Sequence, residues 1–246
     1  MPSSCTTSWS PFPPRTREAQ FDEKWAFVAK KEKRCDRSDP ADDLKGDCWD
    51  HVALDPEHRL VVAVLPGKRT AENAATLVDE FRRRTGGRPM SLITTDEYAP
   101  YREAILRAYG ETVTPPRTGG PGRPRKPYKV APSSLLYATV HKTRRKGRVV
   151  EVEPRLVFGT EAALKAALSR STSSRAVNTS FVERQNGTDR NRNARKVRKA
   201  YSFSKCWIVH RMITYFTLYI YTFCWPVRTL ADRDDSGRLP PPWPPA

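Results

Sequence analysis

The chain has 246 residues and a formal net charge of +17, from 44 Lys and Arg residues against 27 Asp and Glu residues. Such a charge favours a polyanionic partner, of which nucleic acid is the commonest, although a solubility charge or a ribosomal or membrane-surface role would also produce it. The five cysteines contain no C-x-x-C pair, which argues against a zinc ribbon, and no secretory signal peptide precedes them. We therefore expect free thiols in a reducing cytoplasm.

The two ends of the chain have compositions typical of disordered segments. Residues 1–18 are rich in Ser, Thr and Pro without hydrophobic periodicity, and residues 231–246 end in a run of prolines. We therefore expect one folded domain over residues 19–230. Within it, residues 115–132 are rich in Pro, Gly and basic residues, which predicts a linker or a loop.

The first half of this domain predicts the element order β-β-β-α-β-α. Alternating apolar residues from Gln20 predict a strand, and the runs CWDHVALD and RLVVAVLPG predict two more strands. Thr70 can cap a helix, SLITT predicts a fourth strand that ends at Asp96, and a second helix follows over about residues 100–109. Three antiparallel strands, a helix and a parallel fourth strand are typical of an α/β fold with a ribonuclease-H-like core, which has helices on both faces of the sheet.

The second half predicts a hairpin and three helices. The hairpin has strands at 135–142 and 148–158 and a turn between them. A short helix begins at Thr160, and a long helical region covers about 179–200. The segment from 206 to 227 is apolar and aromatic, but its uninterrupted part is too short to cross a bilayer comfortably, so we expect a buried or packed helix and no membrane partner.

Three acidic residues fall at positions that this fold would bring together. Asp22 lies near the start of the first strand, Asp96 lies at the end of the fourth, and Glu183 lies in the first turn of the long helix. In a ribonuclease-H-like sheet the first and fourth strands are neighbours, so the two aspartates would meet and a helix packed across the sheet would add the glutamate. Three carboxylates are suitable ligands for two Mg²⁺ ions, for which Mn²⁺ could substitute, in phosphoryl transfer.

Each of these acids also has an ordinary structural interpretation. Asp22 could be a strand-edge charge, Asp96 a helix cap and Glu183 a solvated helix charge. The functional interpretation therefore depends on all three together. Cys48, Asp50 and His51 also suggest metal ligands, but alternate strand residues point to opposite faces, so we expect ordinary core or surface placement for them.

Four segments resemble the conserved blocks of DDE transposases from small bacterial insertion sequences, specifically the insertion-sequence-one type. They read DEKWAFV, ITTDEYAPY, SFVERQNGTDRNRNARKVRKAYSFSK and YTFCWPVRTL. The resemblance covers about residues 20–230, and the last two segments are its most specific part. It implies a transposase that carries out metal-dependent cleavage at transposon ends and strand transfer to target DNA. It also implies that Asp22, Asp96 and Glu183 are the catalytic metal ligands.

The resemblance also places a basic residue seven positions after the glutamate, which is Arg190 here. That spacing returns to the same helix face, where Arg190 could reach a phosphate and where Asn186 lies as well. The basic run along this helix could be a solvated face, but beside a metal site we interpret it as a track for the DNA backbone. The expected DNA-contacting residues are Arg184, Asn186, Arg190, Arg192, Arg195, Lys196 and Lys199.

The sequence departs from this family at its start. Transposases of this type carry an N-terminal module, often a zinc finger or a helix-turn-helix, that recognises the terminal repeats. Only 21 residues precede Asp22, and they contain neither pattern. We therefore expect a fragment, an alternative start or a decayed copy. The alternative functions are a non-catalytic DNA-binding fragment and a ribonuclease-H-like nuclease. The active form is expected to be a homo-oligomer on DNA, in the cytoplasm and associated with the nucleoid.

Overall fold

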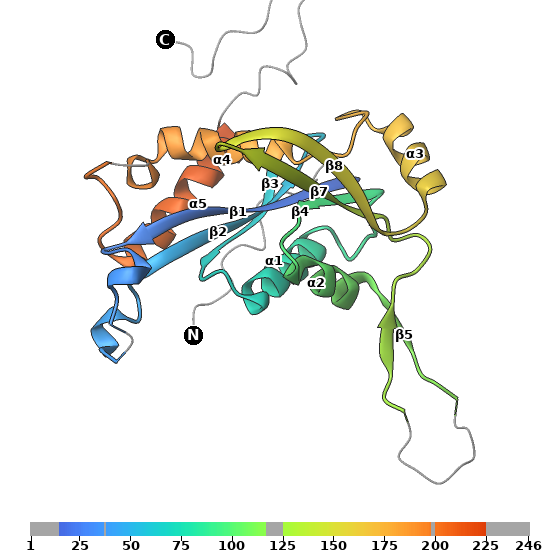
Figure 1. Cartoon of the computed structure of the whole chain (residues 1–246), viewed down its shortest axis with the longest axis horizontal. Helices are drawn as coiled ribbons and strands as arrows, with labels where there is room; N and C mark the ends of the chain where they lie inside the picture. Colours follow the sequence, from blue (N-terminus) through green and yellow to red (C-terminus); the bar gives the residue numbers. More distant parts are fainter. Residues whose placement is uncertain (1–14, 37, 117–124, 198–199, 225–246) are drawn as a thin grey trace, which may run out of the picture.

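The computed structural model describes residues 15–36, 38–116, 125–197 and 200–224. These residues form a mixed α/β fold in which helices cover both faces of a central six-stranded sheet (Figure 1). The predicted element order of the first half, three strands, a helix, a strand and a helix, is confirmed.

The central sheet has the strand order β3-β2-β1-β4-β7-β8. The first three strands form an antiparallel meander, β4 joins β1 in parallel, β7 joins β4 in parallel, and β8 pairs with β7 in antiparallel fashion. The strands are β1 (Glu18–Val28), β2 (Gly46–Asp55), β3 (Leu60–Gly67), β4 (Leu92–Asp96), β7 (Tyr137–Arg145) and β8 (Arg148–Phe158).

Two helices pack on one face of the sheet and three on the other (Figure 1). The first face carries α1 (Ala71–Arg84) and α2 (Pro100–Tyr109), and the second carries α3 (Glu161–Arg170), α4 (Ser180–Arg192) and α5 (Trp207–Cys224). Three short 3-10 turns connect other elements. They are η1 (Glu32–Arg34), η2 (Pro40–Asp42) and η3 (Ala194–Lys196).

The largest part of the core lies between the sheet and α1 with α2. Phe21 of β1 is fully buried there, with its ring 5.2 Å from that of Phe81 and 5.6 Å from that of Tyr101. The predicted cap is confirmed, because the Thr70 side chain accepts a hydrogen bond from the backbone N–H of Asn73. Since successive strand residues face opposite sides, Phe21 on this face places Asp22 on the face that carries α4.

The hairpin and the predicted linker have defined ends. The hairpin prediction is confirmed, and its turn residues Lys146 and Gly147 both have positive φ, as a tight two-residue turn requires. The linker prediction is wrong in part, because β5 (Glu111–Val113) and β6 (Tyr128–Val130) pair as a small sheet that projects from the body (Figure 1). Residues 117–124 of that segment lie outside the described residues.

Two boundary predictions also need correction. The long helix does not reach residue 200, because α4 ends at Arg192, and the extended Asn193 instead accepts a hydrogen bond from the Arg195 N–H to start η3. The N-terminal segment is ordered from residue 15, because Thr16 is buried and Arg17 pairs with Glu57. Residues 1–14 and the predicted disordered tail at 231–246 lie outside the described residues.

The prediction of a packed helix over 206–227 is confirmed for one face of α5 (Trp207–Cys224), while residues 225–227 lie outside the described residues. Helix α5 buries His210, Thr214 and Leu218, while Met212 and Phe216 on its outer side are 64% and 60% exposed. Among the residues that the structure describes, no helix is both long enough and apolar enough to span a membrane.

Candidate active site

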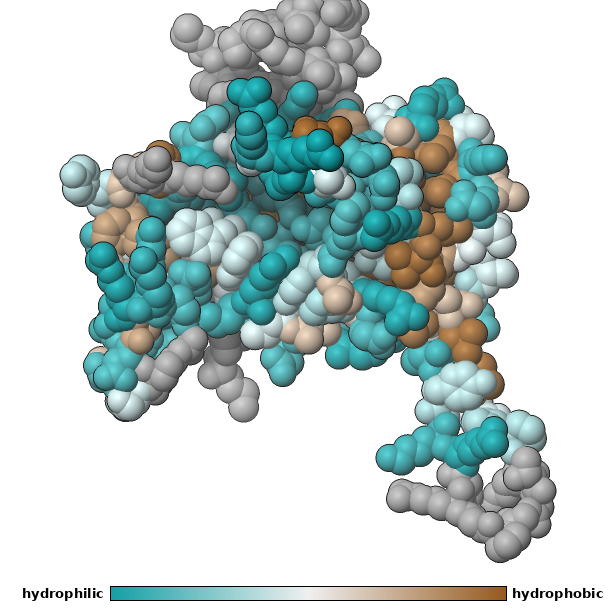
Figure 2. All heavy atoms as spheres, in the orientation of Figure 1, coloured by the Kyte–Doolittle hydropathy of each residue, from teal (hydrophilic) through white to brown (hydrophobic). Residues whose placement is uncertain are grey.

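The site lies where the short strand β4 ends between two longer neighbours. The β1–β4 pairing stops at Phe21 opposite Thr95, and β4 itself ends at Asp96, opposite Val140 of β7. Both β1 and β7 continue beyond this point, so the carboxyl end of β4 opens between them. Open α/β sheets bind ligands at such carboxyl ends. Figure 2 shows that this face of the molecule is hollowed near its centre, with mainly hydrophilic residues around the hollow.

Three carboxylates meet at this point, and we call Asp22, Glu23 and Asp96 the acidic cluster. One oxygen from each lies within 4.8 Å of the others. Backbone N–H groups hold two of them, because Asp22 Oδ1 accepts from Glu23 N at 2.9 Å and Asp96 Oδ1 accepts from Tyr98 N at 3.2 Å. Glu23 pairs with Arg69, whereas neither aspartate forms an ion pair within the described part of the chain.

Among the described residues, only Glu23 of the acidic cluster forms an ion pair, so most of the negative charge of the cluster is not neutralised. Burial, followed by the nearby Asp96 carboxylate, raises the pKa of Asp22 from 3.8 to about 6. Burial likewise raises the pKa of Glu23 from 4.5 to about 7, although Arg69 lies against it. Ionising both Asp22 and Glu23 near neutral pH is therefore costly unless a cation binds beside them.

Helix α4 carries Glu183 to the edge of this cluster. The helix lies across β1, because Asn186 Nδ2 donates to Asp22 Oδ2 at 2.8 Å and Val182 N donates to Gln20 Oε1 at 3.1 Å. Glu183 precedes Asn186 by about one turn on the same face, a rise of roughly 4.5 Å. The negative charge of Glu183 also contributes to the raised pKa of Asp22.

The Glu183 carboxylate itself is held by other groups. It forms a close ion pair with Lys142 of β7 and accepts a hydrogen bond from Thr179 Oγ1 at 2.6 Å. The structure therefore brings Asp22 and Asp96 together, as predicted, and places Glu183 beside them but outside the acidic cluster.

Sequence reasoning missed two residues here, Glu23 and Lys142. Strand alternation puts Glu23 on the opposite face from Asp22. Because β4 ends early, the edge of β1 is open here, and both carboxylates can approach Asp96 around that edge. Lys142 reaches Glu183 because β7 extends beyond the end of β4, and Lys142 lies on this extension.

The predicted DNA-contacting residues divide into three groups. Arg184, Arg192 and Arg195 are exposed and Arg190 is half-buried, which leaves these four predictions open. Two predictions are wrong: Asn186 is buried against Asp22, and Lys196 is buried with its ammonium group on Asp50 and Asp189. Lys199 lies outside the described residues.

A buried ion network lies under the basic segment. Lys24 and Lys196 both bridge Asp50 and Asp189, and all four side chains are essentially inaccessible. Burial raises the pKa of Asp50, but the ammonium groups of Lys196 and Lys24 outweigh it and hold this pKa well below the usual value. The network ties β1 and β2 to α4 and η3, which fixes the helix that carries Glu183.

Cys48, Asp50 and His210 also come close enough for a shared ion. Asp50 is nevertheless already paired with Lys196 at 2.7 Å and with Lys24 at 3.5 Å, so a further cation there would meet two ammonium groups. His51 points to the other face, where its Nε2 donates to the Lys68 carbonyl at 3.1 Å. Cys48, Asp50 and His51 are all buried, which confirms the expected core placement, and His51 faces away from the other two.

Comparisons with known proteins add no assignment to this geometry. No protein-family model matches the chain, and no curated protein matches it significantly. The resemblance of four segments to transposase blocks consequently stays a prediction, and the functional case depends on the site itself.

Proposed function

We propose that the chain is the catalytic domain of a Mg²⁺-dependent DDE transposase, which cleaves DNA at transposon ends and transfers the strand to target DNA. DNA and a second copy of the chain are the partners that this proposal includes. The observation that carries it is the meeting of Asp22 and Asp96 at the carboxyl end of β4, where neither forms an ion pair with a described residue.

The sheet topology supports the same proposal. An antiparallel β3-β2-β1 meander joined in parallel to β4 and β7 has the strand order expected for a ribonuclease-H-like core. We propose this core as the fold, with the β5–β6 pair and the strand β8 as additions to it. In that arrangement the first and fourth strands carry the two aspartates, and α4 carries the glutamate across the sheet.

The residues at the site fit divalent ions that prefer oxygen ligands. Asp22, Asp96 and Glu183 would hold them, and Asn186 orients Asp22 through its amide nitrogen. The other amide atom, Asn186 Oδ1, is buried and has no hydrogen-bond partner among the described residues, so it can accept a bond from a bound water. When bound, Mg²⁺ supplies activation of the attacking hydroxyl and stabilisation of the leaving oxygen.

Several side chains of the protein prepare the site for a polyanionic substrate. Arg69 forms an ion pair with Glu23, and its guanidinium lies over the rings of Trp49 and Tyr98. These contacts of Arg69 hold the Glu23 carboxylate in place. Lys142 holds Glu183 until a cation competes for it. The exposed Arg184 can meet the DNA backbone beside the site.

The test is DNA nicking and strand transfer with purified protein. The substrate is a duplex that carries the DNA flanking the gene, incubated with Mg²⁺ or with EDTA. We expect Mg²⁺-dependent nicking that Asp96→Asn abolishes and that Asp43→Asn, an exposed aspartate away from the site, leaves unchanged. Equal Mg²⁺-dependent nicking by the wild type and Asp96→Asn would reject the proposed site. No nicking by the wild type would favour the alternative of a non-catalytic DNA-binding protein.

A further inference from the structure

A second hollow lies along β1, beside the acidic cluster. It has a volume of about 570 Å³, within the usual range for ligand sites. Three of its aromatic rings form a continuous row, because Trp25 lies 5.8 Å from Phe27 and Phe27 lies 4.8 Å from Phe203. A fourth aromatic residue in the lining, Tyr201, is 97% exposed.

The charge around this hollow is positive. Among the described residues, its lining contains the exposed Lys31 and Arg195 and no acidic residue. Lys205 adds a cation, with its Nζ 3.0 Å from the centre of the Phe203 ring. Lys196 lines the hollow as well, but its ammonium group belongs to the buried ion network. The hollow therefore combines aromatic side chains with two exposed cations, Lys31 and Arg195, that can meet an anion.

The hollow and the acidic cluster share one open strand edge. On this edge β1 is paired with β4 as far as Phe21, and its next contact is an isolated bridge from Val28 to Ser204. The acidic cluster lies at the start of the open stretch and Trp25 lies three residues further along. That separation is about 10 Å, or roughly three base steps of a B-form strand.

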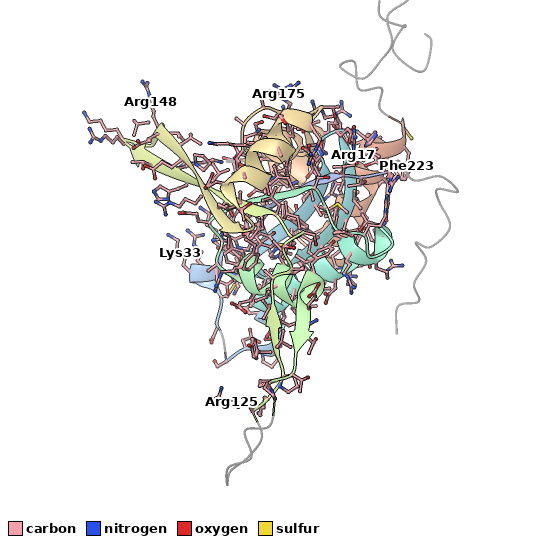
Figure 3. The ribbon with its side chains drawn as sticks, turned by 90° about the vertical axis from the view of Figure 1, so that its right-hand side faces the viewer. Arg17, Lys33, Arg125, Arg148, Arg175 and Phe223 are labelled. Carbon is pink, nitrogen blue, oxygen red and sulfur yellow. The ribbon has the colours of Figure 1, made fainter. Side chains whose placement is uncertain are left out.

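Basic side chains extend this surface in two directions. Figure 3 shows Lys33 of η1 and Arg148 of the β7–β8 hairpin projecting from the same side of the molecule. Lys33 lines an adjoining depression beside Trp25, whose lining also contains Lys31 and the acidic residues Glu32 and Asp47. A nucleic-acid strand lying across this side would meet cations at both ends.

We propose that the aromatic hollow binds an unpaired nucleobase of the DNA strand that is processed at the acidic cluster. The proposal rests on the proposed function. An aromatic platform accepts any base through stacking, while nearby Lys and Arg side chains bind the flanking phosphates. Holding one base out of the duplex fixes the strand, so that a phosphate roughly three nucleotides away lies at the cluster.

The test measures DNA binding in EDTA, so that it does not depend on cleavage. Fluorescence anisotropy is recorded for a single-stranded oligonucleotide and for a blunt duplex of the same sequence. Tyr201→Ala and Phe203→Ala should each weaken binding to the single strand by roughly 5- to 150-fold and affect the duplex much less. Phe216→Ala, which removes a 60% exposed aromatic ring from α5, is the matched control and should change neither.

The variants also separate stacking from simple charge attraction. Arg195→Ala should weaken binding to both DNA forms and reduce the salt dependence of the affinity. A 2-aminopurine base at the unpaired position should lose fluorescence on binding to the wild type and keep it with Tyr201→Ala. Because Tyr201 is 97% exposed, its substitution by Ala removes almost no buried surface from the fold.

Two results would overturn this proposal. One is unchanged single-strand affinity in both aromatic variants, and the other is an equal loss for the single strand and the duplex. Either result would leave the nicking assay unaffected, since that assay depends on Asp96. Conversely, loss of base binding without loss of nicking would remove the hollow from the reaction while keeping the catalytic proposal.

Discussion

Replacing Asp22 with Asn should stabilise the metal-free protein at neutral pH. The pKa of Asp22 rises from 3.8 to about 6, mainly through burial, and this difference corresponds to a cost of about 3 kcal/mol when the group is ionised in the fold. The Asp22 carboxylate accepts two hydrogen bonds, from Glu23 N and from Asn186 Nδ2. Asn removes the charge but has one oxygen, so it keeps only one of these bonds, and the loss of the other costs about 1 kcal/mol. The net gain is about 2 kcal/mol.

The pH dependence of this gain has a defined sign. A carboxyl group with a raised folded-state pKa destabilises the fold progressively as pH rises from 3.8 to about 6, so the advantage of Asp22→Asn should be complete at pH 7.5 and absent near pH 4. For a chain of this length a gain of about 2 kcal/mol raises Tm by roughly 4–8 °C. Thermal and urea unfolding in EDTA measure it, with Asp43→Asn as the control. A variant no more stable than the wild type at pH 7.5, or equally favoured at pH 4, would refute the reasoning.

Two other substitutions test the elements that position the site. Lys24→Met should lower the free energy of unfolding in urea by about 3–5 kcal/mol, because Asp50 and Asp189 stay buried with one ammonium partner fewer. A loss below about 1 kcal/mol would show that the network contributes little to stability. Lys142→Gln should change stability by less than about 1 kcal/mol and lower the Mg²⁺ concentration needed for half-maximal thermal stabilisation, because the ammonium group no longer competes for Glu183. An unchanged Mg²⁺ midpoint would contradict that role for Lys142.

Local sequence signals predict much of this fold because local interactions decide it. The Thr70 cap and the apolar face of α1 lie within one helix, and the hairpin turn at Lys146 and Gly147 is set by two residues. The predicted end of the long helix is wrong because the Asn193 side chain accepts a hydrogen bond from the Arg195 N–H. This bond competes with helix continuation, and helix periodicity does not reveal it.

The candidate site is less predictable because it depends on strand lengths and registers. Asp22 and Asp96 could be paired from their places on neighbouring strands. Glu23 joins them only because β4 ends opposite Phe21, and this end cannot be read from alternation alone. The charge of Lys196 alone predicts a DNA contact. Its burial depends instead on Asp50 of β2 and Asp189 of α4, and sequence patterns do not show that these two residues lie beside it.

Divalent-metal binding at the acidic cluster is the most direct test of the account. Titration of the metal-free protein with Mn²⁺, followed by electron paramagnetic resonance of the free ion, measures it without any DNA. We expect saturable binding by the wild type that Asp22→Asn and Asp96→Asn each weaken at least tenfold, by roughly 1.4 kcal/mol or more, while Asp43→Asn binds as the wild type does. Wild-type affinity in both cluster variants would contradict the account, because the bound ion would then lie elsewhere on the protein.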